Sequence, residues 1–201
     1  DLNEAVSDEA IDGFIIATPN YTHADILEAL LDAGKPVFLE KPMATTVADA
    51  ARIVRMVADS GVSVQVGLQY RYKAIYVEAR HEVLERQAVG GVKTLSIREH
   101  RIPFLDKVGQ WNKFNKFSGG TLVEKCCHYF DLFAQSRPCR VYATGGQMAT
   151  YEDFEYRGER ADILDAAMVL VEYENGVRAT FDICMFVPLF YEELIVCGDG
   201  G

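Results

Sequence analysis

The sequence lacks the features that mark several specialised classes of protein. No apolar run among its 201 residues is long enough to span a membrane, and the N-terminal residues carry no basic and apolar signal pattern. The five cysteines show no zinc-site spacing, because only Cys126 and Cys127 lie near each other. Acidic residues outnumber basic ones by 30 to 20, which argues against the basic face of a general nucleic-acid binder. We therefore expect a cytoplasmic globular protein with reduced thiols, no metal site, no membrane contact and no nucleic-acid partner.

The first third of the sequence alternates strand and helix patterns. Runs rich in apolar residues at Ile11–Ala17, Val37–Leu39 and Val62–Val66 have the length of buried parallel strands. Two amphipathic helical patterns lie between them, and Gly34 and Gly61 end these helices. A β-α-β-α-β order with short connections implies right-handed crossovers and a parallel sheet.

The pattern changes near Gln69. Helical patterns cover residues 72–89 and 121–134, and Asn175-Gly176 between two β-rich runs is a strong hairpin signal. Five strands are predicted, at Val92–Arg101, Val141–Met148, Ala166–Tyr173, Val177–Phe186 and Glu193–Cys197. The sequence therefore predicts two domains, an α/β domain with a parallel sheet over residues 1–68 and an α+β domain with an open, mostly antiparallel sheet over residues 69–201.

Polar clusters follow each of the three predicted parallel strands. They are Thr18 to His23, Glu40-Lys41-Pro42 and Gly67 to Arg71. Because ligands bind at the edge where parallel strands end, we expect these clusters to converge on one site. The first two clusters also have ordinary interpretations. Residues 18–23 are of the types that begin a helix and need no ligand for that, and a lysine after a strand is usually a solvated loop residue. Pro42 restricts Lys41 to an extended backbone, and a lysine held in this way could relay a proton.

The predicted helix 121–134 carries three chemically active side chains. Glu124, His128 and Asp131 are spaced by four and then three residues, which places them on one helix face. A carboxylate one turn before a histidine can orient the imidazole as a catalytic base, although a surface helix with one satisfied histidine is an equally simple interpretation. Gly119-Gly120 just before the helix would allow close approach of a ligand.

Two further residues have open interpretations. Arg71 would hold a polar substrate group or pair with an acid of this acidic chain. Trp111 lies in an irregular stretch rich in aromatic and basic residues, where it would contact a sugar or cover the core.

Three segments resemble the Gfo/Idh/MocA oxidoreductases, which include glucose–fructose oxidoreductase and inositol dehydrogenase. They are Ala17–His23, Ala33–Pro42 with its Glu-Lys-Pro element, and Gly119–His128. The resemblance covers essentially the whole chain. It implies that residues 1–68 belong to a Rossmann domain and that residues 69–201 belong to a domain whose sheet is used for dimer or tetramer contacts.

The resemblance also implies a reaction and a set of site residues. The reaction is hydride transfer between NAD or NADP and a CH–OH group of a sugar, cyclitol or related polyol. Lys41 matches the catalytic lysine and His128 the histidine that acts on the substrate hydroxyl, with Glu124 orienting it. The expected cofactor contacts are Thr18, Pro19, Asn20, His23, Glu40, Lys41 and Gln69, and the expected substrate contacts are Arg71, Trp111 and Asp131.

The sequence departs from the family pattern in two ways. Glu124 stands where the family usually has Asp, which keeps the charge but adds a methylene. No G-x-G-x-x-G segment precedes the first strand, so the unit that would bind the pyrophosphate and choose NAD or NADP is missing. We therefore expect an internal fragment of a longer protein that alone binds the dinucleotide weakly or not at all.

Two other functions are compatible with this fold. Some proteins built on it bind the dinucleotide and regulate transcription without turnover, and others use NAD transiently to cleave glycosides. Lys41 and His128 together argue against a pure regulator, because binding alone requires neither.

Overall fold

The computed structural model describes residues 1–134 and 136–201, which form two compact units. The first unit comprises Asp1–Leu68 and Lys107–Cys127, and the second comprises Gln69–Asp106 and His128–Gly201. The sequence predicts a change of pattern near residue 69, and the structure adds that residues 107–127 return to the first unit. Glu124 therefore belongs to the same unit as Lys41.

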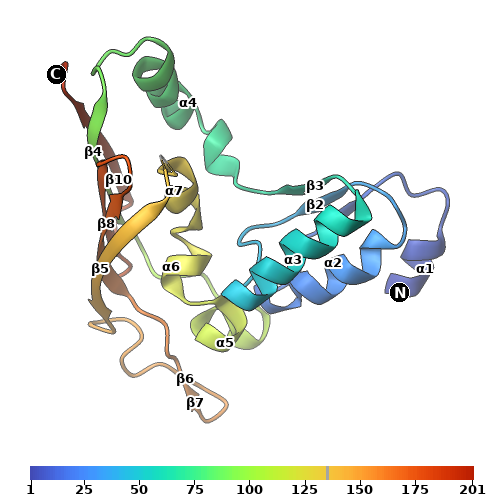
Figure 1. Ribbon diagram of the computed structural model, residues 1–201. Coiled ribbons are helices and arrows are strands. Elements are labelled where there is room, and N and C mark those ends of the chain that lie inside the picture. Colours follow the sequence, from blue (N-terminus) through green and yellow to red (C-terminus); the bar gives the residue numbers. More distant parts are fainter. Residues whose placement is uncertain (135) are drawn as a thin grey trace. The chain divides into compact units, whose positions relative to one another are not determined.

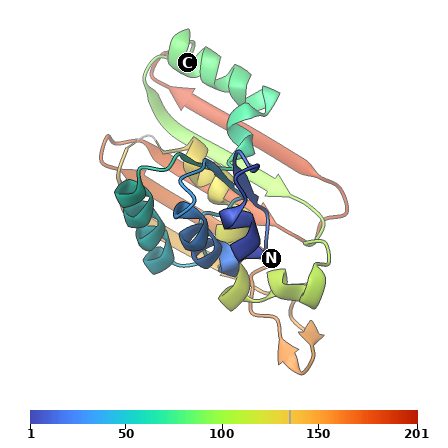
Figure 2. The same ribbon diagram turned by 90° about the vertical axis from the view of Figure 1, so that its right-hand side faces the viewer.

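A three-stranded parallel sheet forms the centre of the first unit, in the order β1-β2-β3. Helices α2 and α3 lie side by side against it (Figures 1 and 2). The elements are α1 (Leu2–Ser7), β1 (Phe14–Ile16), α2 (His23–Leu31), β2 (Val37–Leu39), α3 (Val47–Ser60), β3 (Val64–Val66), α5 (Asn115–Ser118) and α6 (Thr121–Glu124), with 3₁₀ turns at Asn20–Thr22 and Val108–Lys113. The parallel sheet predicted from the apolar runs is confirmed, and α1 is a helix that the pattern did not predict.

Local chemistry explains where α3 begins and ends. The Thr46 hydroxyl accepts the backbone N–H of Asp49 at 3.0 Å, which satisfies one of the free N–H groups of the first turn. Gly61 ends the helix with φ of 67°, a left-handed conformation that glycine adopts at little cost. Ile53 then points into a core that also contains Ile16, Leu27 and Leu39, all at most 2% exposed.

A five-stranded sheet forms the centre of the second unit, in the order β10-β4-β9-β8-β5. Three of the four pairings are antiparallel and β4–β9 is parallel, which confirms the mostly antiparallel sheet. The strands are β4 (Val92–His100), β5 (Pro138–Gly146), β8 (Ala166–Tyr173), β9 (Arg178–Cys184) and β10 (Tyr191–Gly198), and β6 (Glu155–Tyr156) pairs with β7 (Glu159–Arg160) in a separate hairpin. The turn between β8 and β9 contains Asn175 and Gly176, as the sequence predicts.

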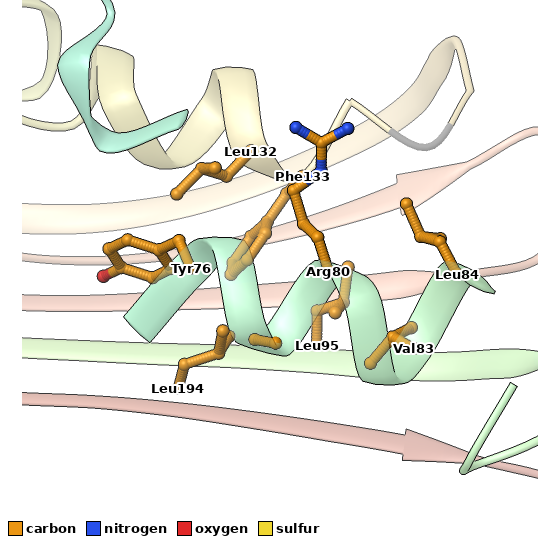
Figure 3. A pocket seen from close by; sticks show the side chains of 9 residues that line it. Tyr76, Arg80, Val83, Leu84, Leu95, Leu132, Phe133 and Leu194 are labelled. Carbon is orange, nitrogen blue, oxygen red and sulfur yellow. The ribbon is translucent and has the colours of Figure 1, made fainter. Parts of the chain in front are cut away.

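Helix α4 (Ala74–Arg80) and the π-helical turn His81–Glu85 cover one face of this sheet, where the sequence predicts a single helix over 72–89. Figure 3 shows Tyr76 and Val83 of this helical segment near Leu194 of β10 and Leu95 of β4, with Leu132 and Phe133 close by, while Leu84 lies at the far end of the pocket. These side chains surround a cavity of about 60 Å³. Because the lining is almost entirely aliphatic and aromatic, we interpret the cavity as incomplete core packing.

The helix predicted over 121–134 is interrupted, which corrects the expectation that its three polar side chains share one face. It forms α6 (Thr121–Glu124) and α7 (Cys127–Leu132), with a turn at Lys125 and Cys126. In a continuous helix the Glu124 carbonyl would accept the N–H four residues on. Here that carbonyl accepts the Lys41 ammonium at 2.9 Å, so a tertiary contact competes with the helical pattern.

Asp165 organises the loop after β5. Its side chain is fully buried, and its two oxygens accept the backbone N–H groups of Met148, Ala149, Thr150 and Tyr151. Burial opposes the negative charge, but the four N–H groups outweigh it and hold the pKa of Asp165 below its ordinary value.

Asp165→Asn is expected to lower the free energy of unfolding by about 2 kcal/mol at pH 7, because an amide nitrogen would face N–H donors. The depressed pKa means that the contribution of the carboxylate is present above the unfolded-state value and is lost as pH falls through the folded-state value. The difference between wild type and variant should therefore shrink below about pH 4. Urea unfolding of both proteins between pH 3 and pH 7 measures it, and a constant difference would contradict the assignment.

No helix in the described residues is both long enough and apolar enough to cross a membrane. Within the same residues, no group of three or more His, Cys, Asp or Glu side chains could hold a metal ion.

Candidate functional site

Lys41 lies just after β2 and is held by Glu124. Its ammonium donates to the Glu124 backbone oxygen at 2.9 Å and to carboxylate oxygen Oε1 at 3.1 Å. The two side chains are 18% and 13% exposed, so the pair is largely removed from water but still reachable. An ion pair of this kind, with a second hydrogen bond to the ammonium, holds the lysine in one direction.

The other oxygen of the Glu124 carboxylate is occupied by Asn20. The Asn20 amide donates to Oε2 at 2.5 Å and to the backbone oxygen of Ser118 at 3.1 Å. Asn20 is among the cofactor contacts that the family resemblance implies, yet this residue is 4% exposed.

The remaining polar residues after β1 and β2 differ in accessibility. Thr18 is exposed and its hydroxyl lies 2.7 Å from that of Thr22, while Pro19 is half-buried. Glu40 is half-buried and its carboxylate accepts the backbone N–H of Lys41 at 3.1 Å. These groups can meet a ligand at the strand ends without rearrangement of the core.

His23 has a different environment. It is fully buried, and its ring nitrogens lie 2.9 Å from the Pro42 carbonyl oxygen and 3.0 Å from that of Thr18. The ring therefore connects the loops that follow β1 and β2. His23 thus supports these two loops, and its contact with a cofactor stays a prediction.

The two glycines before α6 approach the chain's own atoms, which corrects the expectation that they leave room for a ligand. Gly119 has φ of 80°, and a Cβ there would lie 3.0 Å from the Thr45 backbone oxygen. Gly120 has φ of 85°, and a Cβ would lie 2.3 Å from Oδ1 of Asn115. Glycine is needed at both positions for conformation and for packing inside the first unit.

In the second unit His128 stacks on Tyr70. The rings lie 4.2 Å apart with an interplanar angle of 10°, and His128 is 2% exposed. Tyr70 in turn stacks on Tyr76 at 5.4 Å. Tyr70 is not among the site residues predicted from the sequence, although it belongs to the third polar cluster. Only its position directly after Gln69 could have indicated it.

Two acidic side chains are buried behind this stack. Glu99 is 1% exposed and Glu192 lies directly opposite it on the neighbouring strand. The hydroxyl of Tyr129 donates to Glu99, and Lys73 lies 2.5 Å from Glu192. The Tyr76 hydroxyl also donates to Glu192, at 2.9 Å, and burial together with this contact strongly raises the pKa of Tyr76. The Lys73 ammonium and the tyrosine hydroxyls thus supply polar partners for the two buried carboxyl groups, and Tyr70, on which His128 stacks, also donates to Glu192 at 3.5 Å.

Arg71 and Asp131 form a bidentate pair in the second unit. The guanidinium donates to the two carboxylate oxygens at 2.7 and 2.6 Å, and this contact raises the pKa of Arg71 above its ordinary value. Of the two alternatives that the sequence leaves open for Arg71, the structure contains the ion pair. Gln69 is exposed, and Trp111 is half-buried in the 3₁₀ segment of the first unit.

Comparison with known families also divides the chain after residue 68, but residues 107–127, which belong to the first unit, fall within the second match. Residues 1–68 match the model described as oxidoreductase family, NAD-binding Rossmann fold, and residues 81–201 match the model described as oxidoreductase family, C-terminal alpha/beta domain. The chain belongs to the Gfo/Idh/MocA oxidoreductase family. The resemblance inferred from the three sequence segments is thus confirmed, and so is the predicted fold class.

Individual members of the Gfo/Idh/MocA family show the extent of the match. The chain is 36% identical over 200 residues to inositol 2-dehydrogenase of Paracoccus denitrificans, covering 98% of this chain and 54% of that protein. It is 30% identical over 200 residues to inositol 2-dehydrogenase of Rhizobium meliloti, covering 97% and 56%. The chain spans about half the length of the curated relatives it matches.

Solved structures of the family show the same fold. A putative myo-inositol dehydrogenase from Sinorhizobium meliloti 1021 superposes with a TM-score of 0.84 at 24% identity, covering 100% of this chain and 59% of that one. Levoglucosan dehydrogenase in complex with NADH and levoglucosan superposes with a TM-score of 0.82 at 21% identity, covering 98% and 55%.

Proposed function

We propose that the whole protein is an NAD(P)-dependent oxidoreductase that acts on a CH–OH group of a cyclitol, sugar or related polyol. The observation that carries the proposal is Lys41, a reachable ammonium fixed by Glu124 at the end of a parallel strand. The relatives at 30% and 36% identity are inositol 2-dehydrogenases, which supports a cyclitol as the substrate class.

The residues at the strand ends of the first unit fit the nicotinamide end of a dinucleotide. Thr18 is exposed, and Pro19, Glu40 and Lys41 are half-buried, so all four are accessible. The hydroxyl, the carboxylate and the ammonium can hydrogen-bond a carboxamide and a ribose. Gln69, also exposed, remains a proposed contact of the same cofactor. The dinucleotide, when bound, accepts or supplies the hydride.

The chain's own residues would handle the proton and the charge. We assign His128 to remove the proton of the substrate hydroxyl during oxidation, and Lys41 to stabilise the negative charge that develops on the oxygen. Glu124 holds the Lys41 ammonium in place. Arg71 and Asp131, as a pair, and Trp111 remain the proposed substrate contacts, with the pair presenting a fixed guanidinium.

A spectrophotometric screen of the whole protein tests this proposal. NAD or NADP is offered with inositols and sugars, and absorbance at the reduced nicotinamide band is followed. Net reduction of cofactor with at least one polyol is the expected result. Glycoside release without net cofactor change would favour the hydrolase, and cofactor binding with neither reaction would favour the regulator.

We further propose that the open face of the five-stranded sheet joins copies of the protein into a dimer or tetramer. This face exposes apolar side chains, including Tyr142 and Met168 at 71% and 60% exposure, beside a cavity of about 290 Å³ lined in part by Met148 and Phe186. Exposed apolar surface of this kind is typical of an interface. Sedimentation equilibrium should show an oligomer that Met168→Asp dissociates; a wild-type monomer would contradict the proposal.

A further inference from the structure

We infer that Asn20 is a positioning residue, which fixes the Glu124 carboxylate and through it the Lys41 ammonium. The inference rests on the proposed function, because it assigns Lys41 a role at the substrate oxygen. It assigns Asn20 a role different from the cofactor contact that the sequence suggests.

The orientation of the Asn20 amide follows from its neighbours. The carboxylate oxygen of Glu124 lies 2.5 Å away and the carbonyl oxygen of Ser118 lies 3.1 Å away. Both atoms are acceptors only, so the amide nitrogen, with its two N–H donors, must face them. The side chain is 4% exposed, and with both donors used it presents no further N–H group to a ligand.

The carboxylate of Glu124 is thereby fixed at both oxygens. Oε2 accepts Asn20 and Oε1 accepts Lys41 at 3.1 Å. A carboxylate with one partner could rotate or follow the lysine, whereas one held on two sides defines where the ammonium lies. The restraint matters more for glutamate than for aspartate, because the additional methylene adds a rotatable bond.

The bond to Ser118 gives Asn20 a second, structural role. It connects the turn after β1 to the residue before Gly119-Gly120, and the Tyr21 ring contacts Phe117 of the same segment with centroids 4.9 Å apart. A test must therefore separate loss of structure from loss of positioning.

Asn20→Asp and Asn20→Ala in the whole protein provide that test, with Asn3→Asp on exposed α1 as a control that adds the same charge. Both Asn20 variants are expected to lower kcat at neutral pH by roughly 10- to 100-fold, the usual effect of a supporting side chain, with the Kd of the dinucleotide within about twofold of wild type. For Asn20→Asp the loss should diminish as pH falls from 8 toward 5. The introduced carboxyl repels Glu124 when ionised but donates a hydrogen bond when protonated.

Three outcomes would contradict the positioning role of Asn20. Wild-type kcat in folded Asn20→Ala would overturn the inference, as would a weakened dinucleotide affinity at unchanged kcat or a pH-independent loss in Asn20→Asp. In a Glu124→Gln background, Asn20→Ala should add less than about a twofold loss, because coupled residues are not additive. If the Asn20 variants do not fold, Glu124→Asp replaces them, since it keeps the charge but draws the carboxylate away from Asn20. It is expected to lower kcat, and wild-type kcat would overturn the inference.

Kinetic measurements on the wild type and on the variants distinguish an error in the role of Asn20 from an error in the proposed function. If the wild-type protein reduces neither NAD nor NADP with any inositol or sugar, the proposed function is wrong. If Lys41→Ala is inactive and the Asn20 and Glu124→Asp variants are fully active, only the role of Asn20 is wrong.

Discussion

Replacing Lys41 by alanine is expected to lower kcat of the whole protein by about a hundredfold or more, the usual scale for a group that assists proton transfer. The ammonium lies 3.1 Å from the Glu124 carboxylate and 2.9 Å from its backbone oxygen, so its charge has a defined position. Steady-state kinetics with the substrate found in the polyol screen measures the effect.

The control for this prediction is Lys35→Ala. Lys35 donates to the backbone oxygen of Asp8 at the surface of the same unit, and its loss should leave kcat unchanged. Lys41→Arg keeps a charge, but the guanidinium has a planar shape and more donors than an ammonium, so we expect it to recover only part of the rate. A Lys41→Ala enzyme with wild-type kcat would refute the proposed role of this lysine.

His128→Ala should lower kcat by about a hundredfold or more for a different reason, the loss of the group that accepts the substrate proton. The imidazole is 2% exposed and stacks on Tyr70 at 4.2 Å, so its removal leaves a ring-sized space. Imidazole added to the solution is expected to restore part of the rate by occupying that space. Kinetics with and without added imidazole measure both effects.

Two further variants separate chemistry from packing. His81→Ala removes a histidine that is 49% exposed and pairs with Glu85, and it should keep wild-type kcat. Tyr70→Phe keeps the ring against His128 and is expected to lose far less activity than Tyr70→Ala. If His128→Ala turned over like the wild type, another base would have to carry the reaction.

Short-range patterns were sufficient to predict most of the secondary structure. Thr46 and Gly61 mark the ends of α3, and the apolar runs mark β1 to β3, because capping, backbone conformation and side-chain periodicity act within a few residues. The Asn-Gly turn marks the β8–β9 hairpin for the same reason. The Glu-Lys-Pro element and the Gly-Gly segment were sufficient to identify the family.

Contacts between residues distant in sequence determined the break between α6 and α7 and the partners of the polar side chains. The spacing of Glu124 and His128 predicts one helix face, but Lys41 binds the Glu124 carbonyl and the helix is interrupted between them. Similarly, nothing local indicates that Asn20 meets Glu124 across 104 positions, or that Arg71 meets Asp131 across 60.

The amino-acid sequence alone thus determined the helices and strands, the parallel sheet and the family, since each depends on periodicity or on a motif a few residues long. Only the tertiary structure determined which groups the polar side chains bind. A hydrogen bond requires two groups within about 3 Å, and that distance depends on how whole elements pack. Lys41 could be recognised as a catalytic candidate from its motif, whereas its support by Glu124 and Asn20 became visible only in three dimensions.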